Sequence, residues 1–560
     1  MESDLLPHWL DLRRPLIQDD GNAVRLTVRR GPGLERPMGE TKSGETMGND
    51  ALHGVDGNDI PLVRRQLVIG SVAAAVAVAV LSVAALGLDN QSAPNERSPS
   101  GVLSIGAASA DIAPSQPVAL DGQFGLRVSQ KVDTPITANV VALESREGDR
   151  SLDTAVMVSC DLVAISDLLL GKVRQATQKR LPDLNVKKVF LNATHTHTAP
   201  VTRPGVYDIP KTGVMQVEDY CDFAARRIAE AIQQAWKGRK PGRFTFGLAH
   251  AAVAENRRAT YADGRAVMYG RTDQPDFRGL EGFEDHDVGT LFFWNDAGKL
   301  IAMAVNVACP SQEVEGLSNL NADFWHPVRE SLRKRYGQDL CVLGWTGAAG
   351  DQSPHLMYRS KAEERMRQLR KLTRPEELAR RIVAAVDETF ETIKNDRHCG
   401  VPLIHRVATL QLPMRLVTDA EYSEVKAAIA QENPTQMRNR WHTRVMERYE
   451  RQKTDPQPTL PAEIHVLRIG DAVVCTNSFE LFVDYGVQMK ARSRAAQTFI
   501  IQLVGGGPLC YLATERAVRG GGYSAVVQSN LISPKGGQIL VDRTVELIDS
   551  MWAKANPAKK

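Results

Sequence analysis

The chain has 560 residues, of which 43% are hydrophobic and 24% charged, and its formal net charge is +3. A chain of this length can bury a sizeable core, and its nearly balanced charge, with basic residues spread along the sequence, does not indicate a nucleic-acid-binding surface. The seven cysteines form no Cys-x-x-Cys pair, which favours buried thiols over a disulfide framework.

The first hundred residues differ in composition from the rest. Residues 1–63 are polar and lack an apolar period, so we predict a disordered leader, which translation from Met47 would shorten. Residues 64–88 begin with two arginines and continue as an uncharged run long enough to span a bilayer. Residues 89–100 are polar and are predicted to be a linker.

Paired arginines directly before an apolar run are typical of a twin-arginine export signal. An uncleaved transmembrane anchor is the alternative, and it would give the protein a route to membrane association through residues 67–88. We therefore expect export from the cytoplasm, to the periplasm or to the membrane.

The pattern becomes globular from Val102 onward. Apolar runs predict strands and segments with 3.6-residue spacing predict helices. Strands are predicted near 105–110, 154–159, 186–191, 243–251, 288–293, 300–307, 340–345, 464–474 and 498–504. Helices are predicted near 168–180, 217–236, 323–335, 362–394 with a break at Pro375, 422–451 and 537–554. This alternation predicts one α/β domain over 101–556, with a mixed sheet, β-α-β units and outer helices.

Two of the twelve histidines lie one residue apart in the segment Asn192–Pro200, directly after a predicted strand. Alternate side chains of an extended segment share a face, so His195 and His197 can point into one pocket. Open α/β sheets place their sites at such strand ends. A metal ligand beside a proton-transfer group would explain the pair. A loop with two solvated imidazoles is the alternative, and the loop alone does not separate the two.

Other chemistry-bearing residues also follow predicted strands. Cys309 ends the strand 300–307, and Glu480 follows the strands of 464–474. Small residues in the loop 346–354 would let backbone amides approach a ligand, although a tight structural turn is equally compatible. Taken alone, the adjacent arginines Arg257 and Arg258 are more typical of a solvated surface than of a functional site.

Taken together and in this order, several motifs resemble those of the neutral ceramidase family, zinc-dependent amidases that release a fatty acid from ceramide. The motifs are GAASADIAP, NATHTHTAP, ENRR, GAAGDQSP, NSFEL and CYLAT. The resemblance covers Val102 to the C-terminal helix and implies the catalytic domain of that family. The C-terminal β-sandwich common in the family is not expected, because few residues follow Tyr511.

The resemblance also implies roles for five residues. His195 would be a zinc ligand, with Glu480 and Tyr511 completing the metal site. His197 would transfer protons, and Arg257 would bind the carbonyl oxygen and its developing charge. These roles are chemically coherent, because Zn²⁺ acidifies water, an imidazole can take its proton, and a guanidinium stays charged.

One position departs from the family pattern. The family's second histidine ligand stands in an Ala-His-Pro context, where this chain has Ala308-Cys309-Pro310. A thiolate is a good zinc ligand, so our hypothesis is that Cys309 ligates zinc; the alternative is an inert buried thiol beside a weakened or lost site. His326 and His286 are less favoured substitute ligands.

We therefore expect a zinc-dependent hydrolase that cleaves an N-acyl amide bond of a ceramide-like lipid by a metal-activated water. The partner would be a lipid-like amide substrate and the cofactor Zn²⁺. One alternative is a metal-dependent hydrolase of another amide or an ester; amidohydrolase barrels also begin with a His-x-His pair. The other is a catalytically inactive exported binding protein, in which Cys309 would mark the loss of the site.

Overall fold

The computed structural model describes residues 100–431 and 436–552. The chain divides into two units, Met1–Gln91 and Ser92–Lys560, and every described residue belongs to the second. The predicted leader, the run 64–88 and the linker up to residue 99 lie outside the described residues. Within the part that is described, no helix is long and apolar enough to cross a membrane. The expectation of a transmembrane protein is corrected accordingly.

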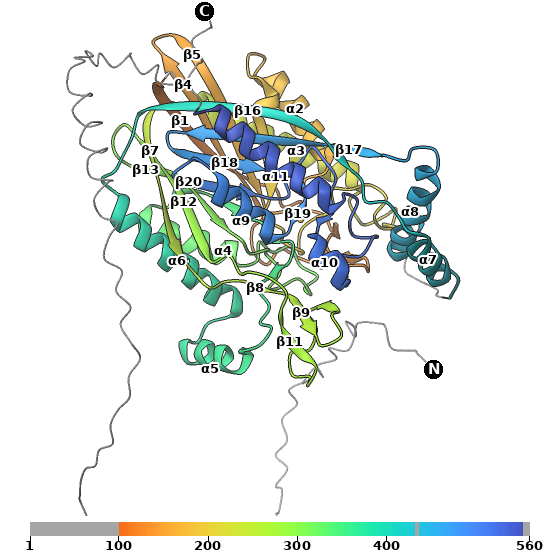
Figure 1. The fold of residues 1–560 in the computed structure, drawn as a ribbon. Coiled ribbons are helices and arrows are strands. Elements are labelled where there is room, and N and C mark those ends of the chain that lie inside the picture. The colour runs from red at the N-terminus through yellow and green to blue at the C-terminus, as the bar shows by residue number, and fades with distance from the viewer. Residues whose placement is uncertain (1–99, 432–435, 553–560) are drawn as a thin grey trace, which may run out of the picture. The chain divides into compact units, whose positions relative to one another are not determined.

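A twelve-stranded mixed sheet has three arms that meet at β1 (Ser100–Asp111) (Figure 1). The first arm consists of β7 (Lys240–His250), β12 (Asp287–Asn295), β13 (Leu300–Val307) and β14 (Cys341–Thr346). The second consists of β4 (Thr137–Glu147), β5 (Arg150–Cys160) and β6 (Val189–Ala193). The third consists of β16 (Gly400–Pro413), β17 (Thr459–Ile469), β18 (Ala472–Thr476) and β20 (Gln497–Ile501).

Each arm ends in the same way. The pairs β5–β6, β13–β14 and β18–β20 are parallel, whereas the other pairs of the large sheet are antiparallel. A parallel pair requires a crossover, and each of these pairs is joined by a segment that contains a helix. The predicted α/β class with a mixed sheet, β-α-β units and outer helices is therefore confirmed.

The arms enclose a central core and carry helices on their outer faces. Leu103, Phe190, Phe293, Trp345 and Phe499 come from all three arms and pack in one buried cluster. Three further apolar clusters lie between an arm and its helices. The covering helices are α2 (Asp167–Arg180) and α3 (Val217–Lys237), α4 (Trp325–Tyr336) and α6 (Arg374–Ile393), and α9 (Val483–Arg492) and α11 (Pro534–Ser550).

Shorter elements surround the strand ends. The helices are η1 (Val186–Lys188), α5 (Ser360–Arg370), α7 (Asp419–Gln431), α8 (Gln436–Gln452) and α10 (Glu515–Gly520). A small sheet contains β9 (Arg258–Tyr261), β10 (Ala266–Met268) and β11 (Phe277–Leu280). Two-stranded pairs are β2 (Ala119–Leu120) with β3 (Arg127–Val128), β8 (Glu255–Asn256) with β15 (Gln352–Ser353), and β19 (Glu480–Leu481) with β21 (Tyr511–Leu512).

Most predicted elements occur where the sequence pattern put them, and two long strands, β4 and β16, were missed. The expected break at Pro375 is found, because this proline occupies the first turn of α6, where its missing N–H is tolerated. β16 was not predicted, since its buried and exposed positions do not alternate cleanly.

Candidate active site

The parallel strand ends of the three arms meet, and the loops after them are hydrogen-bonded to one another. The amide of Ser311, after β13, donates to the carbonyl of Thr194, after β6 (3.3 Å). The amide of Gln502, after β20, donates to the carbonyl of Thr346 at the end of β14 (3.0 Å). Parallel strand ends are where α/β sheets place their sites. The fold thus gathers loops that are far apart in the sequence.

His195 follows β6, and its buried ring is fixed on both sides. Nδ1 lies 2.7 Å from the carbonyl oxygen of Val163, so Nδ1 carries a proton, and in the neutral ring the Nε2 lone pair is left for another partner. Nε2 lies 3.4 Å from the Glu480 carboxylate. A backbone carbonyl that fixes the tautomer in this way is typical of metal-ligating histidines.

The expectation of extended backbone through the two histidines is wrong. His195 has φ 67°, in the left-handed region, which costs a non-glycine residue about 1–2 kcal/mol. The two rings nevertheless meet, with centroids 4.8 Å apart. His195 and His197 thus lie against each other through a strained turn. Such strain persists only where the surroundings hold it, which is common at functional sites.

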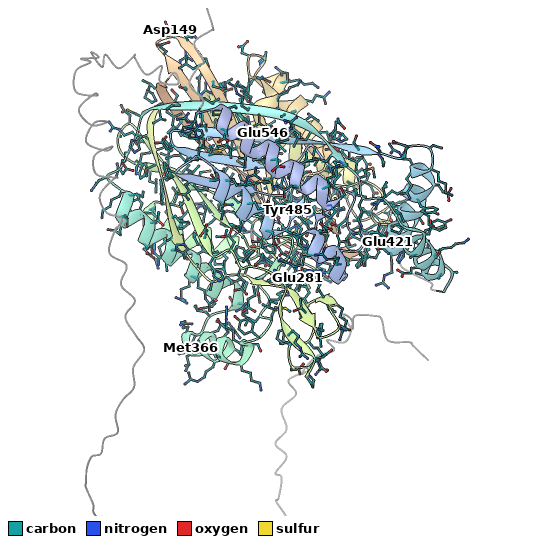
Figure 2. All side chains as sticks on the ribbon, in the orientation of Figure 1. Asp149, Glu281, Met366, Glu421, Tyr485 and Glu546 are labelled. Carbon is teal, nitrogen blue, oxygen red and sulfur yellow. The ribbon has the colours of Figure 1, made fainter. Side chains whose placement is uncertain are left out.

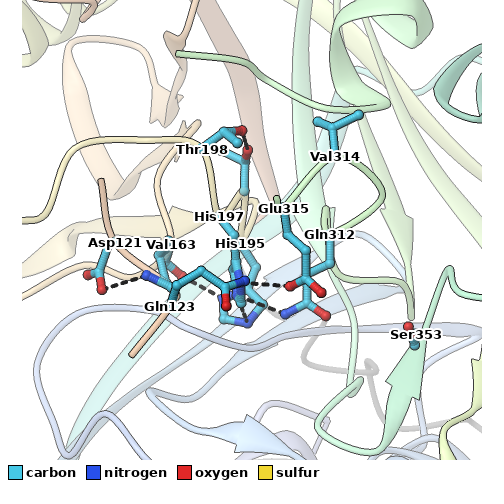
Figure 3. A network of polar contacts seen from close by, with 12 residues as sticks. Asp121, Gln123, Val163, His195, His197, Thr198, Gln312, Val314, Glu315 and Ser353 are labelled. Atoms are coloured by element: carbon cyan, nitrogen blue, oxygen red, sulfur yellow. Dashed lines mark hydrogen bonds and ion pairs between the residues drawn. The ribbon is translucent and has the colours of Figure 1, made fainter. Parts of the chain in front are cut away.

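His197 lies between a carboxylate and a carboxamide (Figure 3). Its Nδ1 lies 3.0 Å from Oε2 of Glu315, and its Nε2 lies 2.8 Å from the side-chain nitrogen of Gln312. The side-chain N–H of Gln312 can only donate, so Nε2 accepts it and the proton of the neutral ring is on Nδ1. Nδ1 lies close to the Glu315 carboxylate but makes no hydrogen bond with it. Burial lowers the pKa of His197, so its imidazole is neutral at pH 7 and able to take a proton.

Glu315 stays ionised beside this imidazole. Burial alone would raise its pKa, but the contact with His197 and the positive potential of His355 and Arg257 outweigh burial and hold the pKa at about 2. A charged carboxylate at Nδ1 orients the ring and stabilises the imidazolium that forms when Nε2 is protonated.

Backbone also packs against the His197 ring. A Cβ at Gly122 would lie 2.4 Å from Cγ of His197, and Gly122 has φ +96°. Only glycine fits there without displacing the ring.

Glu480 and Tyr511 are brought together by the parallel pairing of β19 with β21, in which they are direct neighbours. Burial would raise the pKa of Glu480, but His195, Arg257 and Tyr511 outweigh it and hold the pKa at about 2. Burial and the Glu480 carboxylate raise the pKa of Tyr511 well above its usual range. A carboxylate and a phenol oxygen thus lie on the same side as the free nitrogen of His195.

Arg257 is buried in the same cluster. Its guanidinium donates to the Tyr511 hydroxyl (3.1 Å), the Gly350 carbonyl (2.8 Å) and the Gln312 side-chain oxygen (3.2 Å). It also lies 3.8 Å from Glu480. Burial would lower its pKa, but Tyr511, Tyr269 and Glu480 raise it above the usual value, so the cation persists.

The surface interpretation of the Arg257-Arg258 pair is wrong. Both side chains are buried, and Arg258 pairs with Glu281 (2.6 Å) and donates to Ser524 (3.1 Å). Arg258 ties the small sheet to the C-terminal segment, whereas Arg257 contacts Gln312, Tyr511 and Glu480. The sequence could not distinguish these roles, because adjacent guanidiniums look alike without their partners.

Cys309 is not brought into this cluster. Strand alternation turns it with Val305 and Val307 to the outer face of the first arm, where it is fully buried among apolar side chains. Its Sγ donates to the Val253 carbonyl (3.4 Å), and burial raises its pKa well above the usual range, which disfavours the thiolate. Among the described residues, no contact of Cys309 with His195 is found. The structure therefore gives no support to Cys309 as a zinc ligand.

The two substitute histidines also lie apart. His286 pairs with Glu284 (3.2 Å), and His326 lies in the first turn of α4 with the charges of Glu330 and Arg329 near it. Neither contacts the His195 cluster through any interaction found in the described residues.

The donors that converge are one imidazole nitrogen, one carboxylate and one phenol oxygen, from His195, Glu480 and Tyr511. Residues 100–431 and 436–552 contain no group of three or more His, Cys, Asp or Glu side chains arranged to hold a metal. Tyrosine is not among these residue types. Nitrogen and oxygen donors suit Zn²⁺, and three protein donors with a fourth position open is the composition of a catalytic zinc site. The residues thus fit such an ion.

Two solved ceramidase structures resemble this fold. Neutral ceramidase from Pseudomonas aeruginosa matches with a TM-score of 0.57 and 16% sequence identity, over 80% of this chain and 75% of that one. The chain has the neutral ceramidase fold. A ceramidase complexed with C2 matches with a TM-score of 0.57 and 17% identity, over 80% and 76% of the two chains. The sequence itself matches no family model and no curated protein.

Three further residues of the cluster, Gln312, Glu315 and Tyr523, were not predicted from the sequence. Gln312 and Glu315 lie after Cys309 in no recognisable motif. Tyr523 stacks edge-on to Tyr511 with ring centroids 5.8 Å apart, and burial and Glu480 raise its pKa to about 12. The Gly-rich turn 520–522 was the only signal near it.

Proposed function

We propose that the chain is a zinc-dependent hydrolase of N-acyl amide bonds, with a ceramide-like lipid amide as its substrate. One observation carries the proposal. His195, His197, Arg257, Glu480 and Tyr511 come from four separate segments and form one buried polar cluster. The neutral ceramidase fold supports the same reaction class, because the solved structures that resemble this chain are ceramidases.

His195, Glu480 and Tyr511 would hold the metal. Bound zinc would lower the pKa of a water and polarise the substrate carbonyl. The charges favour a cation there, because Glu480 is ionised and the His195 lone pair faces it. Arg257 is also cationic and opposes the metal, but its guanidinium is held by hydrogen bonds to Tyr511, Gly350 and Gln312.

His197 would move the proton. With Nδ1 beside the Glu315 carboxylate (3.0 Å), the neutral Nε2 accepts a proton from water as the oxygen attacks the amide carbon. The same nitrogen then donates that proton to the departing amine. Gln312 must release Nε2 first, because its side-chain N–H occupies the lone pair in this structure.

Arg257 would stabilise the oxygen that becomes negative. Its guanidinium is buried and permanently charged, and its Nε–H is buried with no acceptor among the described residues. A substrate oxygen can satisfy that donor, and an N–H aimed at a developing oxyanion lowers the barrier in a site that excludes water.

We also propose that the protein acts outside the cytoplasm, because Arg64 and Arg65 precede the apolar run of a typical export signal. Hydrolysis of a different amide or of an ester would use the same residues. A catalytically inactive binding protein is the alternative from another class, since the expected fourth ligand Cys309 lies in the core.

Hydrolysis of a short-chain N-acyl sphingosine by the full chain, with zinc added or chelated, tests the proposal. The wild type should hydrolyse the amide only with zinc, and His197→Ala should lower kcat by about 10²–10⁴-fold. His326→Ala is the matched control, a histidine outside the cluster that should leave the rate unchanged. A His197→Ala variant as fast as the wild type, or a zinc-loaded wild type that cleaves no amide, would contradict the proposal.

A further inference from the structure

The helix α5 presents one face that packs on nothing in the described chain. None of its residues is buried, and Met366 and Leu369 are 40% and 63% exposed. Figure 2 shows Met366 at an outer edge of the described unit. Lys361, Arg365 and Leu369 are spaced four residues apart, and Met366 lies three residues before Leu369, so the four lie on one side of the helix. That side is apolar and basic, which is the composition of helices that lie in a membrane interface.

The charges of α5 leave this side positive. Glu363 pairs with Arg359 and Arg381, and Glu364 pairs with Arg367 on the side that faces the body. By contrast, Lys361, Arg365 and Lys371 are exposed, and none forms an ion pair with a described carboxylate. The acidic groups of the helix are therefore neutralised by its neighbours, while the outward cations are not. Such a surface is complementary to anionic lipid headgroups.

Both flanks of α5 are attached to the loop that holds His197. Before the helix, the imidazole of His355 contacts the Gln312 carbonyl (2.9 Å). After it, Arg374 at the start of α6 pairs with Glu313 (3.1 Å). A surface bound at α5 would thus lie close to the candidate active site.

Exposed apolar side chains also gather on other segments that hold this site. Arg127 donates to the carbonyls of His197 (2.6 Å) and Leu317 (2.6 Å). Leu317 is 41% exposed, and Leu126, the neighbour of Arg127, is 36% exposed. Tyr358, two residues before α5, is 47% exposed. Exposed apolar residues that cluster at a site mark an interaction surface.

We propose that the exposed face of α5, made by Lys361, Arg365, Met366 and Leu369, docks the protein onto an anionic phospholipid bilayer beside the candidate active site. The headgroups pair with the basic side chains, and Met366 and Leu369 enter the acyl boundary. The site would then receive a lipid amide directly from the bilayer. Only this last step rests on the proposed function, because binding to the bilayer does not require catalysis.

Sedimentation of the full chain with vesicles tests the docking. The vesicles contain phosphatidylcholine with or without phosphatidylglycerol. In the double variant Met366→Gln/Leu369→Gln, we expect binding to fall at least about tenfold on phosphatidylglycerol vesicles, since two apolar side chains lose their burial. Leu416→Gln/Val487→Gln is the matched control at similarly exposed positions elsewhere and should bind like the wild type. Equal binding by all three proteins, or an equal loss in the control, would contradict the docking.

Charge and position are tested separately. Lys361→Gln/Arg365→Gln should weaken binding to phosphatidylglycerol vesicles and leave binding to pure phosphatidylcholine unchanged. A loss that is equal on both vesicles would overturn the headgroup pairing. To exclude docking by residues 67–88 alone, Leu369→Trp is compared with Leu248→Trp in vesicles with brominated acyl chains. Quenching should rise for Leu369→Trp only; no quenching there would overturn insertion of α5.

Two further measurements distinguish membrane docking from dimer formation and from the proposed catalytic function. Without lipid, the wild type should have the monomer mass in light scattering, whereas a dimer lost in Met366→Gln/Leu369→Gln would show that a second copy covers the face. With substrate, the same variant should lose turnover of a long-chain amide in vesicles and keep turnover of a short-chain soluble one. If the wild type hydrolyses neither, the proposed function fails, and the vesicle measurements still decide the docking.

Discussion

Replacing Glu315 by glutamine removes one charge from the candidate active site and keeps its shape. Glutamine still places an oxygen beside Nδ1 of His197, which lies 3.0 Å from the carboxylate in the wild type, and Gln312 at Nε2 retains the tautomer. What is lost is the attraction between the carboxylate and the imidazolium that forms during proton transfer. At about 4 Å and an effective dielectric constant of about 20, that attraction is worth about 4 kcal/mol. We therefore expect kcat to fall about 10²–10³-fold, with KM changed by less than about threefold.

Initial rates on a soluble N-acyl sphingosine, at matched zinc content, measure this effect. Glu315→Asp is the control, because it keeps the charge and should retain more activity than the glutamine variant. A Glu315→Gln enzyme with kcat within about threefold of the wild type would refute the role of the carboxylate. A variant with a raised KM and an unchanged kcat would also refute it, since the charge is needed only when His197 is protonated.

The same carboxylate should make folding sensitive to acid. The pKa of Glu315 is about 2 in the folded chain, against an ordinary value of 4.5. A depressed carboxylate pKa stabilises the fold above pH 4.5, and that contribution of about 3 kcal/mol is lost as the pH falls towards 2. Denaturant unfolding should show the wild type more stable than Glu315→Gln at pH 7, with the difference shrinking below pH 4.5. A difference that is the same at pH 7 and pH 3 would contradict this linkage.

Three other substitutions test the remaining assignments. His195→Ala should lose zinc in elemental analysis, whereas His197→Ala should keep it; zinc retained by both would rule out His195 as a ligand. Cys309→Ala should keep its zinc and lose about 1 kcal/mol of stability as a small cavity forms, so loss of the metal would restore Cys309 as a ligand. Gly122→Ala should lower kcat and destabilise the fold by about 1–3 kcal/mol, because its Cβ would meet the His197 ring; a fully active variant would show that the ring can shift.

Much of the fold follows from local sequence pattern. The β-α-β unit β5–α2–β6, the hairpin β12–β13 and the helix α3 each have a clear period and clear ends, so their positions could be predicted. β16 could not, because it is long and only partly buried, and its pattern resembles no single period. The helical break at Pro375 was predictable, since proline cannot continue a helix.

Residues of the candidate site could be predicted only where they lie in a recognisable motif. His195, His197, Glu480 and Tyr511 were predicted through ordered motifs, and the structure brings the four side chains into one cluster. Glu315 lies in no motif. It contacts His197 because the loop that carries it folds against the histidine loop. The Cys309 hypothesis failed to find support because strand alternation, which the sequence shows only after the strand is located, turns the thiol to the outer face.

The central claim is that His195, Glu480 and Tyr511 hold a zinc ion beside His197. Anomalous diffraction at the zinc edge, from crystals of the zinc-loaded protein, tests it most directly. We predict one strong peak about 2.0–2.2 Å from Nε2 of His195 and from a Glu480 oxygen, with Tyr511 also within bonding distance. A peak at Cys309, or no peak among these three side chains in fully zinc-loaded crystals, would contradict the account.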